Sequence, residues 1–233
     1  MRSKPVHIAG LALFVGLGGA AVAAPAAYPA MAPAAQYMMA NRDEEIALAR
    51  SAAPPSISAD ADVMVLGAHG YETAAKGKNG FVCFVFRSFT AGFGDPAFWN
   101  PKIRGPNCYN AAAVRSMLPR DIERSQWALS GLTQAQMLER TKAELAAKTY
   151  VMPEPGAVSF MMSKSQYLSD EGVHHWHPHM MFFVLNDQVA TWGASLPGSP
   201  VIAGPNNQEP FTTLFVPVQR WSDGTPDEMP MKQ

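Results

Sequence analysis

Two stretches of the chain are apolar on both faces of an extended strand, and they limit the folds open to it more than any other feature. One is residues 81–86, Phe-Val-Cys-Phe-Val-Phe, and the other is residues 157–163. A strand of this kind lies inside a sheet that is covered on both sides. The sequence therefore predicts a central sheet between two layers.

The remaining pattern predicts an α+β fold with strands on either side of a block of short helices. We expect one domain over residues 41–233, with a mainly antiparallel sheet of about five to seven strands. The predicted strands are residues 63–66, 71–75, 81–87, 157–163, 180–185 and 211–218. The predicted helices begin near Asn41, at residues 111–117, at 119–129 and at 134–148, and Thr133 with Gln136 forms a capping box before the last of them.

The turn residues Gly77-Lys78-Asn79-Gly80 predict a hairpin that joins the second and third strands. A long loop with several aromatic residues follows, over residues 88–109. Loops of this length are usually functional or tied down.

The first 23 residues have the pattern of a secretory signal peptide. Arg2 and Lys4 precede an apolar run, and Ala21-Val22-Ala23 supplies a small-x-small cleavage site. We expect an exported protein, periplasmic or extracellular, in which residues 24–40 form a poorly ordered Ala/Pro-rich spacer. An uncleaved anchor is the alternative. No later stretch of the sequence is long enough to cross a membrane.

Charge argues against nucleic acid as a partner. Removing residues 1–23 takes away two cations and no acid, which changes the net charge from −1 to −3. A mildly acidic chain without a basic patch does not suit nucleic acid or an anionic membrane.

The two cysteines, Cys83 and Cys108, predict a disulfide, because an isolated pair in an exported protein is usually oxidised. Two free buried thiols and a pair of metal ligands are the alternatives, and the absence of CxxC spacing disfavours the second.

Four of the six histidines fall within residues 174–179 and lead directly into an apolar strand. If this segment is extended, His175, His177 and His179 share one face. If it is polyproline-like, His174 and His177 do. Imidazoles grouped in this way can bind zinc or copper, whereas solvated or structural histidines, and a metal-free site, are the alternatives.

Further candidate ligands are Asp170 and Glu171 in the preceding loop, and His69 and Glu72 in another strand region. The methionine pairs Met161-Met162 and Met180-Met181 suit Cu(I) chemically, but methionines more often fill irregular core space.

The His-x-His element is similar to the metal-binding strand of cupins and to the His-x-His-x-Asp-His pattern of metallo-β-lactamases. Each similarity covers only a few residues. Cupins need a glutamate where residues 180–184 stand, and the second pattern needs an aspartate that this chain lacks, so neither family is assigned.

Three functions follow as hypotheses. The first is an exported protein that binds a small ligand or a divalent metal at the histidine segment. The second is a secreted hydrolase that uses a histidine base or a histidine-bound metal. The third is an interaction module that binds a protein partner through an exposed aromatic loop at residues 89–101.

Overall fold

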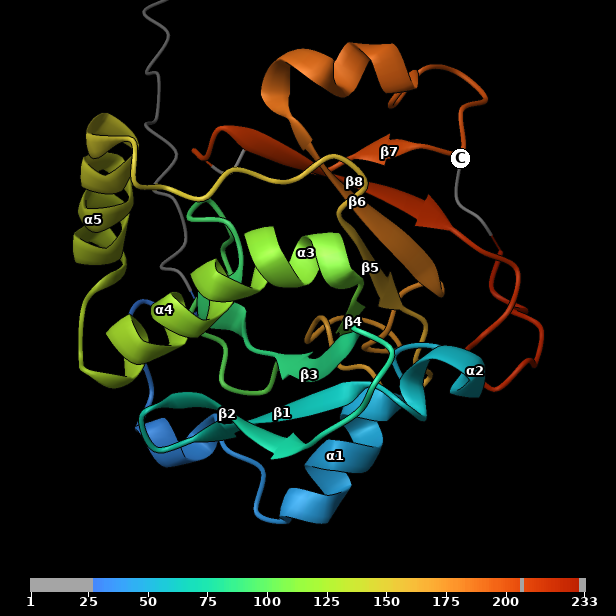
Figure 1. The fold of residues 1–233 in the computed structure, drawn as a ribbon, viewed down its shortest axis with the longest axis horizontal. Helices are drawn as coiled ribbons and strands as arrows, with labels where there is room; N and C mark the ends of the chain where they lie inside the picture. The colour runs from blue at the N-terminus through green and yellow to red at the C-terminus, as the bar shows by residue number, and fades with distance from the viewer. Residues whose placement is uncertain (1–26, 206–207, 231–233) are drawn as a thin grey trace, which may run out of the picture.

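The computed structural model describes residues 27–205 and 208–230, and in these residues the chain forms one mixed sheet of eight strands (Figure 1). The order of the strands is β2-β1-β3-β4-β5-β6-β8-β7, and every neighbouring pair is antiparallel except β1 and β3. The strands are β1 (Asp62–Gly67), β2 (Gly70–Ala75), β3 (Val82–Phe86), β4 (Gly105–Tyr109), β5 (Val158–Met161), β6 (His179–Leu185), β7 (Ile202–Ala203) and β8 (Phe211–Pro217).

The α+β class is confirmed, and the number of strands is one above the expected range. The helices are α1 (Arg42–Arg50), α2 (Pro55–Ser58), α3 (Ala111–Ser116), α4 (Leu118–Leu129) and α5 (Gln134–Ala147). Short 3₁₀ segments are η1 (Ala34–Gln36), η2 (Ser88–Thr90) and η3 (Asn186–Trp192).

Helices cover both faces of the β1, β3 and β4 region, as the doubly apolar strand predicts. Helix α1 packs on one face, and α3 and α4 lie on the other (Figure 1). Along β3, Cys83 and Val85 belong to the small core under α1, whereas Phe84 belongs to the larger core under α3 and α4. The period of two along an extended strand produces this division.

Local signals place the helix ends. The side chain of Asn41 accepts hydrogen bonds from the backbone N–H groups of Asp43 and Glu44 and so caps α1. Thr133 and Gln136 form the expected capping box of α5. A buried ion pair of 2.8 Å between Arg87 and Glu45 holds α1 to the end of β3.

The predicted hairpin around residues 77–80 is wrong. Strand β2 turns back on β1 through the tighter connection between Gly67 and Gly70, and β3 then joins β1 as a parallel neighbour. The backbone at Gly77 lies so close to Asp60 that a Cβ atom there would be 2.1 Å from its carbonyl oxygen. The glycine therefore lets the chain pass close to the start of β1 and enter β3, instead of reversing into a hairpin.

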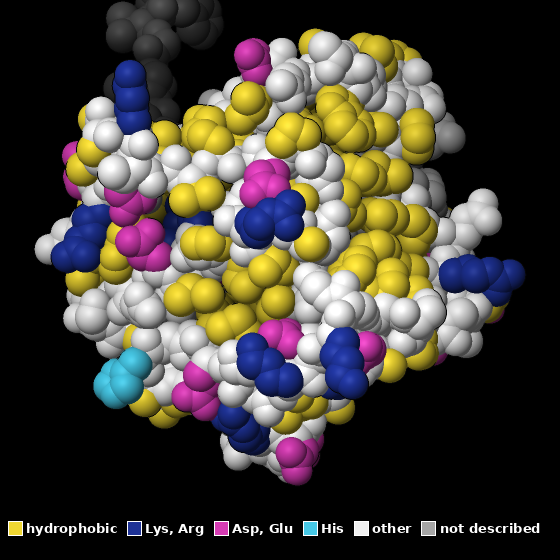
Figure 2. All heavy atoms as spheres, in the orientation of Figure 1, with side chains coloured by type: hydrophobic (Ala, Val, Ile, Leu, Met, Phe, Trp, Pro, Cys, Tyr) yellow, Lys and Arg dark blue, Asp and Glu magenta, His cyan; other side chains and the backbone are white. Residues whose placement is uncertain are grey.

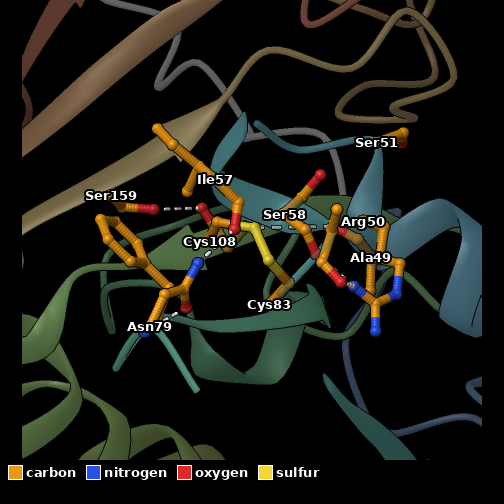
Figure 3. The surroundings of a disulfide bond; sticks show 12 residues. Ala49, Arg50, Ser51, Ile57, Ser58, Asn79, Cys83, Cys108 and Ser159 are labelled. Atoms are coloured by element: carbon orange, nitrogen blue, oxygen red, sulfur yellow. Dashed lines mark hydrogen bonds between the residues drawn. A yellow bond between two sulfur atoms is a disulfide. The ribbon is translucent and has the colours of Figure 1, made fainter. Parts of the chain in front are cut away.

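Part of the expected long loop is a strand. Residues 105–109 form β4, in a register that sets Cys108 directly opposite Cys83. The predicted disulfide between them is confirmed, and it lies buried beneath α1 and the residues around Ile57 (Figure 3).

The N-terminal spacer is ordered where the structure describes it, contrary to expectation. Tyr37 is fully buried, and its hydroxyl donates a hydrogen bond of 2.7 Å to the backbone oxygen of Trp99. The Arg87 side chain donates in turn to the backbone oxygen of Tyr37. Residues 27–40 therefore pack onto the domain, while the predicted signal peptide lies outside the described residues.

The surface shows no gathering of positive charge on the face drawn in Figure 2, where lysines and arginines stand beside acidic residues. Hydrophobic side chains spread over the region of β6 and β8 on the same face. Within residues 27–205 and 208–230, no helix is both long enough and apolar enough to cross a bilayer.

Candidate ligand-binding site

A cavity of about 560 Å³ lies against the face of the sheet that α4 covers, and we name it the sheet cavity. Its floor comes from alternate residues of neighbouring strands, because side chains two apart on a strand share a face. The floor includes Phe86, Asn107, Tyr109, Met161, His179, Met181, Phe183, Thr213 and Phe215. Its walls include residues 90–92 and 94–97, together with Trp176, Arg120 and Ser88.

His179 is the histidine that faces the sheet cavity, and it is 1% exposed. Its Nδ1 lies 2.7 Å from the backbone oxygen of His177. The rings of Trp176 and Phe215 lie 4.8 and 5.6 Å from its own ring. Burial among these groups lowers the pKa of His179 from 6.5 to about 4, so the imidazole is neutral near pH 7.

The other three histidines of the segment have separate partners. His177 Nδ1 lies 2.5 Å from Asp227 Oδ2, and both side chains are nearly buried. The ring of His175 packs edge-on against Trp221, and the ring of His174 stacks on Tyr167.

The cluster expected of these histidines is not formed in the described part of the chain. No three His, Cys, Asp or Glu side chains gather there in a way that could hold an ion. The physical reason is local: His174 has a left-handed backbone with φ 65°, and regular pairing begins only at His179. Neither the extended nor the polyproline period therefore governs the segment, and these histidines would have to rearrange to hold an ion together.

The other candidate ligands also have partners of their own. Asp170 accepts hydrogen bonds from Tyr28, Tyr167 and Lys102, and the Tyr167 bond contributes most to holding its pKa below the usual range. Glu72 pairs with Arg42 on the surface.

His69 is exposed in the turn between β1 and β2, and Glu171 is exposed as well. Met161 and Met181 line the sheet cavity, and Met162 is nearly buried.

Sequence reasoning missed the polar residues of the sheet cavity, among them Ser88, Asn107 and Arg120. Ser88 is 2% exposed, and its hydroxyl has no hydrogen-bond partner among the described residues. Asn107 is 1% exposed and accepts a hydrogen bond of 2.8 Å from Ser159. Arg120 pairs with Asp121 and Glu209, at 2.9 and 3.2 Å. An asparagine within an otherwise apolar strand was the one sequence signal that pointed to a buried polar residue. The strand itself was not predicted, because Gly105 and Pro106 are unusual in strands.

The aromatic loop does not present its rings to solvent. Phe89, Phe93, Phe98 and Trp99 are all at most 5% exposed. The expectation of an exposed aromatic surface at residues 89–101 is wrong, because these rings pack in the main core.

The fold and the sheet cavity are thus the basis for inferring a function, since no family model, curated protein or solved structure matches this chain.

Proposed function

We propose that the protein binds a small, mainly apolar organic molecule in the sheet cavity, beside His179. The observation that carries this proposal is a buried, neutral histidine facing a cavity of about 560 Å³ lined by aromatic and methionine side chains. Cavities of this size that are mostly apolar and contain a few polar groups are typical of small-molecule sites. The unpartnered Ser88 hydroxyl adds support, because buried polar groups are normally paired.

A hydrolase with a histidine base is the weaker candidate. Efficient general bases have a pKa near the working pH. The pKa of His179, about 4, lies well below neutrality. This low pKa favours binding over proton abstraction at this residue.

Export remains part of the proposal. The Cys83–Cys108 disulfide indicates an oxidising compartment, and residues 1–23 have the pattern of a signal peptide. Together they favour a periplasmic or extracellular binding protein.

The proposal is tested by titration with N-phenyl-1-naphthylamine, an uncharged apolar dye whose fluorescence rises in an apolar site. We expect saturable binding of one dye per chain. Thr213→Phe adds a ring to the floor of the cavity and should abolish that binding, since Thr213 lies on the cavity face of β8.

The matched control is Val216→Phe, which adds a ring to the opposite face of the same strand. This variant should bind the dye as the wild type does. A wild-type protein that gives no saturable signal, or a Thr213→Phe variant that binds normally, would show that the sheet cavity is not a binding site.

A further inference from the structure

The polar side chains that line the sheet cavity indicate which ligand it takes, given that it binds one at all. The first is Nε2 of His179. A backbone carbonyl can only accept a hydrogen bond, so the contact with His177 oxygen places the proton of the neutral ring on Nδ1. Nε2 then carries a lone pair and no hydrogen, and it has no hydrogen-bond partner among the described residues. This nitrogen can therefore accept a hydrogen bond from a ligand.

Two uncommitted donors lie on the β3–β4 side of the cavity. The Ser159 hydroxyl donates to Asn107 Oδ1, which leaves the Nδ2 group of Asn107 without a partner among the described residues. The Ser88 hydroxyl, at the start of η2, also lacks one. Both side chains are at least 98% buried, so water does not satisfy them freely.

The register separates the acceptor from the donors. Met161 pairs with His179, and Cys108 pairs with Phe160, so Asn107 lies level with Met161 on its other side. His179 and Asn107 are therefore two strands apart, roughly 10 Å between Cα atoms. A ligand that reaches both carries its polar groups at opposite ends of an apolar body.

The charges at the cavity disfavour an ionic group. Arg120 is the cation in the wall, and its terminal nitrogens pair with Asp121 and Glu209, the second of which is shared with Arg124. Its Nε is buried without a partner among the described residues and could donate only to a further acceptor. Asp95 lies at the rim and is exposed. A charged ligand would leave an unpaired charge in an apolar space, which is strongly unfavourable.

We infer that the ligand is an uncharged, mostly hydrocarbon molecule with a hydroxyl group at one end, which donates to His179 Nε2, and a carbonyl group at the other, which accepts from Asn107 and Ser88. This inference rests on the proposed function.

Three probes of one ring system test it by calorimetry: 2-methoxynaphthalene, 2-naphthol and 6-acetyl-2-naphthol. All are neutral at pH 7. The first has no donor, the second supplies the hydroxyl, and the third adds a carbonyl at the far end. We expect wild-type affinity to rise by about tenfold with each added group, the usual effect of pairing a buried polar atom.

Two variants show which residue produces each gain in affinity. His179→Phe should remove the gain from the hydroxyl and keep the gain from the carbonyl, and Asn107→Leu should do the reverse. Binding of 2-methoxynaphthalene to a variant shows that its cavity is intact. If a variant does not fold, the affinities of the wild type for the three probes still test the inference.

The outcomes separate the inference from the function on which it rests. Equal wild-type affinities for the three probes would overturn the inference and leave a nonselective apolar site. A hydroxyl gain that persists in His179→Phe would also overturn it. If no probe binds the wild type, the proposed function itself fails.

Discussion

His177 and Asp227 join the histidine segment to the C-terminal tail through a contact of 2.5 Å between Nδ1 and Oδ2. The same histidine offers its backbone oxygen to His179. The tail therefore helps to position the residue that faces the sheet cavity.

Removing the carboxylate should destabilise the protein. Asp227→Ala leaves the buried His177 ring without its partner, so we expect the free energy of unfolding to fall by about 1–3 kcal/mol. Urea unfolding measures this. Glu228→Ala, at an exposed neighbour, is the control and should change stability by less than about 0.5 kcal/mol. Equal effects of the two substitutions would contradict a structural role for the pair.

The disulfide should contribute substantially to stability. It closes a loop of sequence separation 25, which corresponds to about 3–4 kcal/mol in the chain-entropy model. Replacing both cysteines by alanine should lower the free energy of unfolding by that amount. Reduction of the wild type in urea should give the same midpoint as the double variant. A double variant as stable as the oxidised wild type would exclude this contribution.

The strands that the sequence predicted are those whose residue types agree with their place in the sheet. β3 and β5 are apolar on both faces, and both are central strands. β4 was missed because Gly105 and Pro106 weaken or exclude most strands. Its pairing depends on β3 and β5, which are distant in sequence and contribute nothing to a local pattern.

The candidate site was predicted only in part for a similar reason. His179 stood out in the sequence, but the expected use of it, beside His175 and His177, assumed a regular strand where the backbone is irregular. Ser88 and Asn107 line the same cavity as His179 only because of the order of the strands. The residues of a cavity that is built from separate elements have no regular spacing in the sequence, so no sequence pattern identifies them.

Metal binding by the histidine segment is tested by titrating zinc and copper into chelator-treated protein. An ion held by His175, His177 and His179 would have to displace Asp227 from His177 and turn His175 away from Trp221. We therefore expect no stoichiometric binding tighter than about 1 mM, a free energy near 4 kcal/mol. One ion per chain at micromolar affinity, weakening at acid pH because metal binding needs neutral imidazoles, would instead establish the metal site.

Export predicts a defined mature N-terminus. Mass spectrometry of protein secreted by an expression host should find chains that start within a few residues of Ala24. Replacing Leu11 and Leu13 by arginine breaks the apolar run and should leave the protein uncleaved inside the cell. A mature chain that retains residues 1–23 would contradict cleavage.

The buried His179 should make stability depend on pH. Its pKa is about 4 in the folded protein and 6.5 without burial. Between these values the unfolded chain binds a proton that the folded one does not, so the free energy of unfolding should fall as pH drops from about 6.5 to 4 and this contribution should level off below. The difference corresponds to roughly 3 kcal/mol.

Groups near His179 also affect this pH profile. The contribution of His179 is therefore measured as the difference between the wild type and a variant that lacks the imidazole. The backbone oxygen of His177 favours protonation of His179, the His177 ring opposes it more weakly, and Arg120 lines the same cavity. Urea unfolding at pH 7, 5.5 and 4.5 should show a smaller loss of stability for His179→Phe than for the wild type. His69→Gln, at an exposed turn, should keep the wild-type dependence. If the His179→Phe profile runs parallel to that of the wild type, the imidazole is not held neutral by burial, and the acceptor at the sheet cavity is lost with it.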